Sequence, residues 1–150
     1  MMPPRRPGTY AARMNPTNLQ LEWADSEVAG TDVSEGGRRL RLRFSAAALR
    51  QQAPGERAVA GHGRNVWLDL TGVEPTDTLP AGCFGRIVQG RVRLDGRWLA
   101  ALPLPGTWAG APEPIDLELR FGHGSELTLH ARGMACDFEG APNFRESLAC

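Results

Sequence analysis

The sequence predicts an all-β protein: a single antiparallel β-sandwich or partly closed barrel of about seven to eight strands, with a short C-terminal helix. From residue 18 onward, apolar residues recur at every second position. That is the period of a strand with one buried face, whereas a helix would repeat every 3.6 residues. Turns rich in Pro and Gly separate most of these apolar runs. The 150 residues are enough for one domain whose core needs neither disulfides nor metals.

Seven segments show the alternation that is typical of a half-buried strand. They are residues 19–23, 38–44, 65–73, 87–94, 97–104, 115–121 and 126–132. In residues 38–44 the leucines and Phe44 share one face, and Arg39, Arg41 and Arg43 share the other. The arginine side of this strand is therefore expected to face solvent.

The first predicted hairpin turns at Asp95 and Gly96, because Gly accepts the positive φ that a tight hairpin turn requires. Two registers are open. A two-residue turn places Arg93 opposite Trp98 and exposes a cation–π pair. A three-residue loop with a bulge places Val92 opposite Trp98 and buries the indole.

The second predicted hairpin joins residues 115–121 to residues 126–131 through a short loop with Gly124 in the left-handed region. A slip by one residue would bury Glu126, so the register should be firm. The expected inward pairs are Leu119 with Leu127, Leu117 with Leu129, and Ile115 with Ala131. The expected outward pairs are Arg120 with Glu126 and Asp116 with His130.

Two short helices are also predicted. The alanine-rich residues 45–55 favour one helix that ends at a Pro-Gly pair. The C-terminal residues 143–150 favour the other, with Asn143 as its N-cap and a glutamate three residues later to complete a capping box. Phe144 and Leu148 fall on one face of this helix and should dock it onto the β domain.

Residues 1–13 are interpreted as a disordered arm or an extension from an upstream start codon, and residues 14–150 as one β domain. Seventeen basic residues balance seventeen acidic ones, so no overall field attracts nucleic acid or anionic lipid. No apolar run is long enough for a transmembrane helix, and no secretory signal follows the basic N-terminus. Nucleic-acid and membrane partners are therefore not expected.

The three cysteines are Cys83, Cys136 and Cys150, and their spacing matches neither a disulfide framework nor a zinc knuckle. Unpaired thiols are typical of the cytoplasm, which is the predicted location. Cys150 is interpreted as a small apolar residue beside the C-terminal anchor. The sequence does not assign a role to any of the three thiols.

No catalytic residue, metal ligand or cofactor is predicted. The nearest nucleophile arrangement is His130 with Cys136 and Asp137, but no Gly-x-Ser-x-Gly elbow accompanies it. The three histidines lack HExxH or paired-Cys spacing, and no glycine-rich loop precedes a helix.

The candidate ligand-binding residues are Arg41, Arg43, Arg93 and Trp98. Outward arginines near an aromatic platform can bind phosphates and stacked bases. The competing interpretation is that these arginines are solvated and protect strand edges from pairing with other chains.

The stretch DVSEGG, residues 32–37, resembles the Asp-x-Ser-x-x-Gly turn of PilZ-type cyclic-dinucleotide receptors, which are small β-barrels. The resemblance implies that Asp32, Ser34 and Gly37 face a ligand. Those receptors also carry an upstream RxxxR element, and the arginines before residue 14 do not have that spacing. Short polar side chains favour such turns for local reasons, and the chain is assigned to no family on this stretch.

The leading functional hypothesis is a small cytoplasmic, non-enzymatic accessory protein. It would bind a partner protein through a sheet face, a strand edge or the C-terminal segment. One alternative is a receptor for a small anionic or nucleotide-like ligand, and the other is a His/Cys hydrolase or metal enzyme. Fold class alone does not decide among them, because all-β folds carry many activities.

Overall fold

The computed structural model describes residues 18–52, 55–74, 83–109 and 112–147. These ranges contain twelve strands: β1 (Leu19–Ser34), β2 (Arg39–Gln51), β3 (Val59–Gly63), β4 (Val66–Thr71), β5 (Gly85–Leu94), β6 (Arg97–Leu99), β7 (Ala101–Leu104), β8 (Gly106–Ala109), β9 (Ile115–Phe121), β10 (Glu126–Ala131), β11 (Gly133–Phe138) and β12 (Arg145–Glu146). One 3-10 turn, η1 (Glu35–Gly37), joins β1 to β2. The arm predicted for residues 1–13 and the thiol of Cys150 lie outside the described residues.

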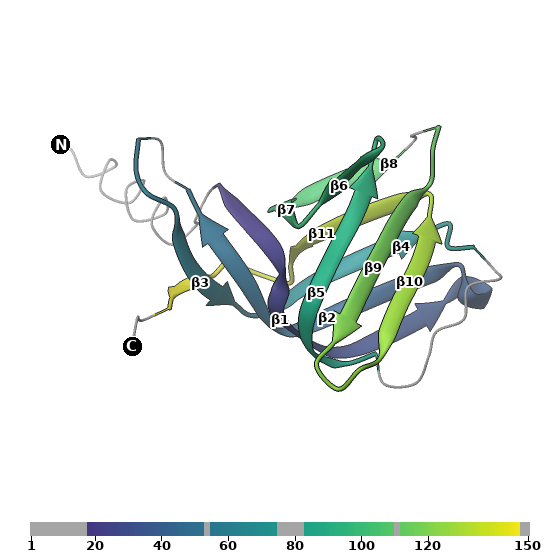
Figure 1. Cartoon of the computed structure of the whole chain (residues 1–150), viewed down its shortest axis with the longest axis horizontal. Coiled ribbons are helices and arrows are strands. Elements are labelled where there is room, and N and C mark those ends of the chain that lie inside the picture. The colour runs from purple at the N-terminus through teal and green to yellow at the C-terminus, as the bar shows by residue number, and fades with distance from the viewer. Residues whose placement is uncertain (1–17, 53–54, 75–82, 110–111, 148–150) are drawn as a thin grey trace.

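All strand pairings among the described residues are antiparallel, which confirms the all-β class. The main path through the sheet is β10-β9-β5-β1-β2-β4-β11-β8, and it does not close into a barrel. In Figure 1, β5, β9 and β10 cross in front of β1, β2 and β4. The strand order leaves β10 and β8 as the two ends of the path.

One apolar core joins the two groups of strands. It combines inward residues of β1, β2, β4 and β11 with inward residues of β5, β9 and β10. Trp23 of β1 is fully buried, and Gly90 of β5 packs directly against it, because a Cβ at residue 90 would lie 2.5 Å from the Cβ of Trp23. No helix in the described ranges has the length and apolar character needed to cross a membrane.

The two longest strands, β1 and β2, continue into a smaller group of strands, and their outer residues, among them Leu21 and Leu49, still belong to this core. Their outer parts pair with β7 on one side and β3 on the other, and β3 pairs with β12. In Figure 1, β3 and the outer part of β2 form the lobe at the left, and β7 lies nearer the middle of the view. The register of β1 against β2 shifts between Glu22 and Gly30, where the strand passes from one group to the other.

Both predicted hairpins are present. In β9 and β10, all five cross-strand pairs have the predicted register. In β5 and β6, Arg93 lies opposite Trp98, so the two-residue turn is the correct alternative. Asp95 and Gly96 both have positive φ, as that turn requires.

The predicted count of seven to eight strands is too low. All seven predicted segments form strands, but residues 97–104 are divided between β6 and β7. The strands that were missed are short or begin with glycine, as β8 and β11 do. Within β11 the inward side chains are Met134, Cys136 and Phe138, which do alternate.

The helix predicted for residues 45–55 is wrong, because β2 continues through Gln51. Here β2 has β1 on one side and β3 on the other. Both neighbours accept and donate main-chain hydrogen bonds. The sheet therefore overrides the helix preference of the three alanines.

The predicted C-terminal helix is also wrong for the described part of that segment, where Arg145–Glu146 forms β12. Asn143 does not cap a helix. Its side chain accepts from Arg64 N at 2.6 Å and donates to Arg64 O at 2.8 Å, which ties it to the loop after β3. Phe144 packs against the core, as the predicted anchor should.

Candidate functional site

The outward side chains of β5, β6, β9 and β10 form what we call the front face, which is turned toward the viewer in Figure 1. Strand register arranges these side chains in three cross-strand rows. Taken from β10 to β5, the rows are His130, Asp116 and Arg93; Thr128, Glu118 and Arg91; and Glu126, Arg120 and Gln89. Trp98 of β6 extends the first row beyond Arg93.

The first row is centred on Asp116, which is 5% exposed although it faces outward. Its carboxylate accepts a hydrogen bond from Arg93, and its Oδ1 lies 2.5 Å from Nδ1 of His130. Burial raises the pKa of Asp116, but the hydrogen bonds from His130 and Arg93 together outweigh burial and hold that pKa below its usual range. Asp116 therefore stays ionised and fixes its neighbours.

Arginines cover the indole of Trp98 at the end of this row. The guanidinium carbon of Arg91 lies 3.9 Å from the ring centroid, and that of Arg93 lies 5.5 Å from it. Arg91 also donates to Glu118 at 2.9 Å. The tryptophan, 39% exposed, is thus held by cations that are themselves held by carboxylates.

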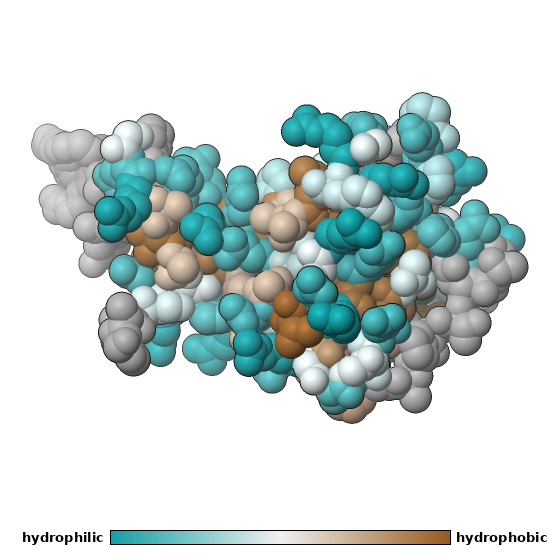
Figure 2. Space-filling view, in the orientation of Figure 1, coloured by the Kyte–Doolittle hydropathy of each residue, from teal (hydrophilic) through white to brown (hydrophobic). Residues whose placement is uncertain are grey.

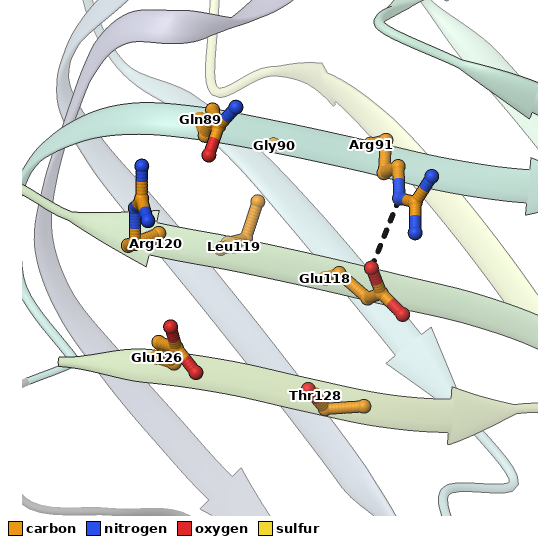
Figure 3. Close-up of a pocket in the computed structure, with 8 residues that line it drawn as sticks. All are labelled: Gln89, Gly90, Arg91, Glu118, Leu119, Arg120, Glu126 and Thr128. Atoms are coloured by element: carbon orange, nitrogen blue, oxygen red, sulfur yellow. Dashed lines mark hydrogen bonds and ion pairs between the residues drawn. The ribbon is translucent and has the colours of Figure 1, made fainter.

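A hollow of about 390 Å³ lies over the remaining rows. Figure 3 shows Arg120, Glu126, Gln89 and Thr128 around it, with one ion pair, between Arg91 and Glu118. Within the described ranges, no hydrogen bond or ion pair engages the side chains of those four residues. The sequence correctly predicted Arg120 opposite Glu126, but it did not predict that neither side chain has a partner in the part of the chain that the structure describes.

An apolar patch borders the hollow. A bulge between Ile87 and Gln89 turns Val88 outward beside Gln89. Phe84 is 55% exposed and lies against His123, with ring centroids 5.5 Å apart. Figure 2 shows a hydrophobic patch over the beginning of β5, within a mainly hydrophilic surface.

The outward side chains of β1, β2, β4 and β11 form the back face, which also contains a buried aspartate. Arg41 binds Asp69 through two hydrogen bonds of 2.6 and 2.8 Å, and Arg39 adds a third of 2.8 Å. These bonds hold the pKa of Asp69 below its usual range, with the Arg41 bond as the largest cause. Arg41 also stacks 4.4 Å from the centroid of Trp67.

The last back-face arginine, Arg43, donates to Asp32 at 2.9 Å. Its guanidinium lies across Gly30, where a Cβ would come within 2.7 Å of Nη2. Each back-face arginine that was predicted to face outward does so, and each has a carboxylate partner.

The four predicted ligand-binding residues are divided between the two faces. Arg41 and Arg43 lie on β2, whereas Arg93 and Trp98 lie on β5 and β6. All three of these arginines are in ion pairs with aspartates. The structure therefore does not bring the four residues together.

The segment that resembles the PilZ turn forms the connection between β1 and β2. Asp32 is on β1 in the ion pair with Arg43, and Gly37 follows in η1 with φ of 90°. The sheet that contains this segment does not close into a barrel, whereas PilZ-type receptors are small β-barrels.

The proposed His/Cys pair is not assembled. Cys136 of β11 points into the core, where its Sγ lies 3.4 Å from Pro103 O, and burial raises the pKa of its thiol to about 12. His130 lies on the front face, bound to Asp116. In the described parts of the chain, no group of three or more His, Cys, Asp or Glu side chains could hold a metal ion.

No protein-family model matches the chain, and no curated protein or solved structure is similar to it. The geometry of the two faces is therefore the basis for a functional proposal.

Proposed function

We propose that the protein is a non-enzymatic binding module that engages a partner protein through the front face. The observation that carries the proposal is the distribution of exposed apolar side chains. Four large apolar side chains are exposed among the described residues, and three of them lie on or beside this face: Val88, Trp98 and Phe84. Phe84 and Val88 lie at one end of β5 and Trp98 lies beside its other end, and exposed apolar groups on one face are typical of protein-binding surfaces.

The composition of the face supports a protein partner. Binding energy at interfaces concentrates in Trp, Tyr and Arg side chains that are held in place before binding. Trp98 and Arg91 meet this description, because Glu118 fixes Arg91 and Arg91 covers the indole.

The internal ion pairs weigh against a small anionic ligand. A phosphate that bound Arg93 would have to displace the carboxylate of Asp116. The receptor alternative is supported by one observation, the unpaired guanidinium of Arg120 in the hollow. A small bound mass that was lost in Arg120→Gln would favour that alternative.

Two matched valine substitutions test the proposal. Val88 is 38% exposed and on the front face, whereas Val33 is 52% exposed on β1, outside that face. Tagged wild-type protein, Val88→Asp and Val33→Asp would be isolated from the native cells, and co-purifying chains would be quantified by mass spectrometry. We expect at least one chain to fall about tenfold with Val88→Asp, as a buried hot spot would, and to be unchanged with Val33→Asp.

The identified partner and the protein, each purified, should then show the same difference in binding between the Val88→Asp and Val33→Asp variants. If every co-purifying chain responds equally to the two substitutions, the front face is not the binding surface. We place this binding in the cytoplasm, which agrees with the buried thiol of Cys136 forming no disulfide among the described residues.

A further inference from the structure

Among the described residues, β10 is the longest proline-free edge strand at the border of the front face, and Glu74 occupies its edge only at His130. β10 has six residues and no proline, and β9 is its one strand partner among the described residues. The other edges are shorter: β8 has four residues, β6 has three and β12 has two. β7 carries Pro103. An open strand edge without proline is a template for another strand.

Main-chain groups along this edge alternate in direction. Phe121 N donates to Ser125 O, which sets the pairing of the hairpin, and Glu74 N donates to His130 O from the opposite side. Residues two apart in an antiparallel strand point their N–H and C=O groups to the same side. Since His130 O points away from β9, the main-chain groups of Glu126 and Thr128 do so as well.

Among the described residues, these groups at Glu126 and Thr128 have no hydrogen-bond partner, whereas His130 O accepts from Glu74 N. An added strand would therefore pair with β10 at Thr128 and Glu126, the part of this edge that Glu74 does not contact. Two outward residues offer two N–H donors and two C=O acceptors.

Side chains of the same residues border the hollow. Glu126 has an unpaired carboxylate, and its row continues to the unpaired guanidinium of Arg120. A basic residue on an added strand, opposite Glu126, would continue the alternation of charge across the row. Opposite charges on neighbouring strands stabilise such a pairing.

We propose that the protein binds an extended segment of its partner by antiparallel strand addition to β10, with a basic residue of that segment opposite Glu126. This inference rests on the proposed function, because it names the kind of partner that the front face accepts. Main-chain hydrogen bonds supply the attachment, and the hollow and Glu126 supply the selectivity.

The test compares Thr128→Pro with Thr128→Val. Proline removes the outward N–H of Thr128 and leaves the ladder to β9 intact, because edge strands accept proline where the N–H faces solvent. The preceding residue, Leu127, is already extended, as proline requires. Valine keeps the N–H and the strand preference, and circular dichroism should show that both variants are folded.

The probe is a phage-displayed library of random dodecapeptides, selected on the intact protein. We expect enriched peptides to carry a Lys or Arg between β-branched residues and to bind wild type and Thr128→Val alike. Their affinity should fall about tenfold or more with Thr128→Pro, since strand addition depends on this edge. Glu126→Gln should weaken them severalfold.

Equal binding to Thr128→Pro, or an absence of enriched peptides, would overturn strand addition. A concentration-dependent dimer that Thr128→Pro dissociates would instead make a second copy the occupant and overturn the partner segment. Failure of this inference is separable from failure of the proposed function. A partner that Val88→Asp releases and Thr128→Pro retains would keep the front face and remove the edge.

Discussion

The front and back faces are built from the same parts. Each has a buried aspartate that is contacted by two basic side chains, and each has a tryptophan stacked on an arginine. On the back face, Asp69 is contacted by Arg39 and Arg41, both permanently charged. On the front face, a histidine takes the place of one arginine.

The faces differ in what remains unpaired. Every back-face arginine on β2 has a carboxylate, so this network is complete without a partner molecule. On the front face, the side chains of Arg120 and Glu126 have no partner within the described ranges, and this face also has an exposed apolar patch and the edge of β10. The complete ion pairing of the back face agrees with a stabilising role for that network, and the proposal of a binding surface therefore concerns the front face.

The largest expected effect is a loss of stability when a tightly packed glycine of β5 is replaced by alanine. Gly90→Ala places a Cβ 2.5 Å from the Cβ of Trp23 and 2.8 Å from Leu119 Cδ2. The Cβ of Trp23 is fixed to the backbone, so the strands must move. We expect overpacking to lower the free energy of unfolding by about 2–3 kcal/mol, measured by urea denaturation.

Gly30→Ala is the matched control on the back face. Its Cβ would meet Nη2 of Arg43, the end of a flexible side chain, at 2.7 Å. Arg43 can swing away and lose an exposed ion pair with Asp32, so the expected loss is below about 1 kcal/mol. Equal losses for the two alanines would show that the packing of β5 on β1 is not tight.

The next effect concerns the two aspartates. Asp69→Asn removes the charge that accepts two hydrogen bonds from Arg41, and we expect a loss of about 2 kcal/mol. Asp116→Asn should cost less, about 1 kcal/mol, because its partners Arg93 and His130 are both more than 40% exposed. Urea denaturation at neutral pH measures both values.

Acid should weaken the same contacts. The folded-state pKa values of Asp69 and Asp116 are both lower than normal, so the unfolded chain binds protons first as the pH falls. Their stabilisation is complete above the ordinary carboxyl pKa and is lost as the pH drops through the lowered values. Asp69→Asn should flatten this acid dependence more than Asp116→Asn does, and the reverse order would contradict the comparison.

Local patterns in the sequence predict much of the front face. The outward alternation of β9 and β10 and the turn at Asp95 and Gly96 determine which side chains share a row. The register of the β9–β10 hairpin follows from the burial of one of its faces, because a slip by one residue would bury Glu126. The bulge that exposes Val88 has no comparable sequence signal, since Ile87 and Val88 are both apolar.

The back-face network could not be predicted, because it depends on strand order. Arg41 and Asp69 are 28 residues apart and meet only because β2 pairs with β4. The predicted helices failed for a related reason. Local propensity favours a helix around Ala47, and the two strands that flank it are distant in sequence or unpredicted.

The smallest expected effects come from the exposed arginine pairs, one on each face. Arg91 pairs with Glu118 and Arg43 with Asp32, both at 2.9 Å and with all four side chains more than 40% exposed. We expect Arg91→Gln and Arg43→Gln each to change stability by less than about 1 kcal/mol, and salt to erase the difference from wild type. Thermal denaturation at low and high ionic strength would measure this.

Because Arg91 also covers Trp98, its loss should weaken partner binding although it barely changes stability. Arg43→Gln should leave partner binding unchanged and should likewise barely change stability. A large stability loss for Arg91→Gln alone would make the front-face network structural, and the functional distinction between the faces would then disappear.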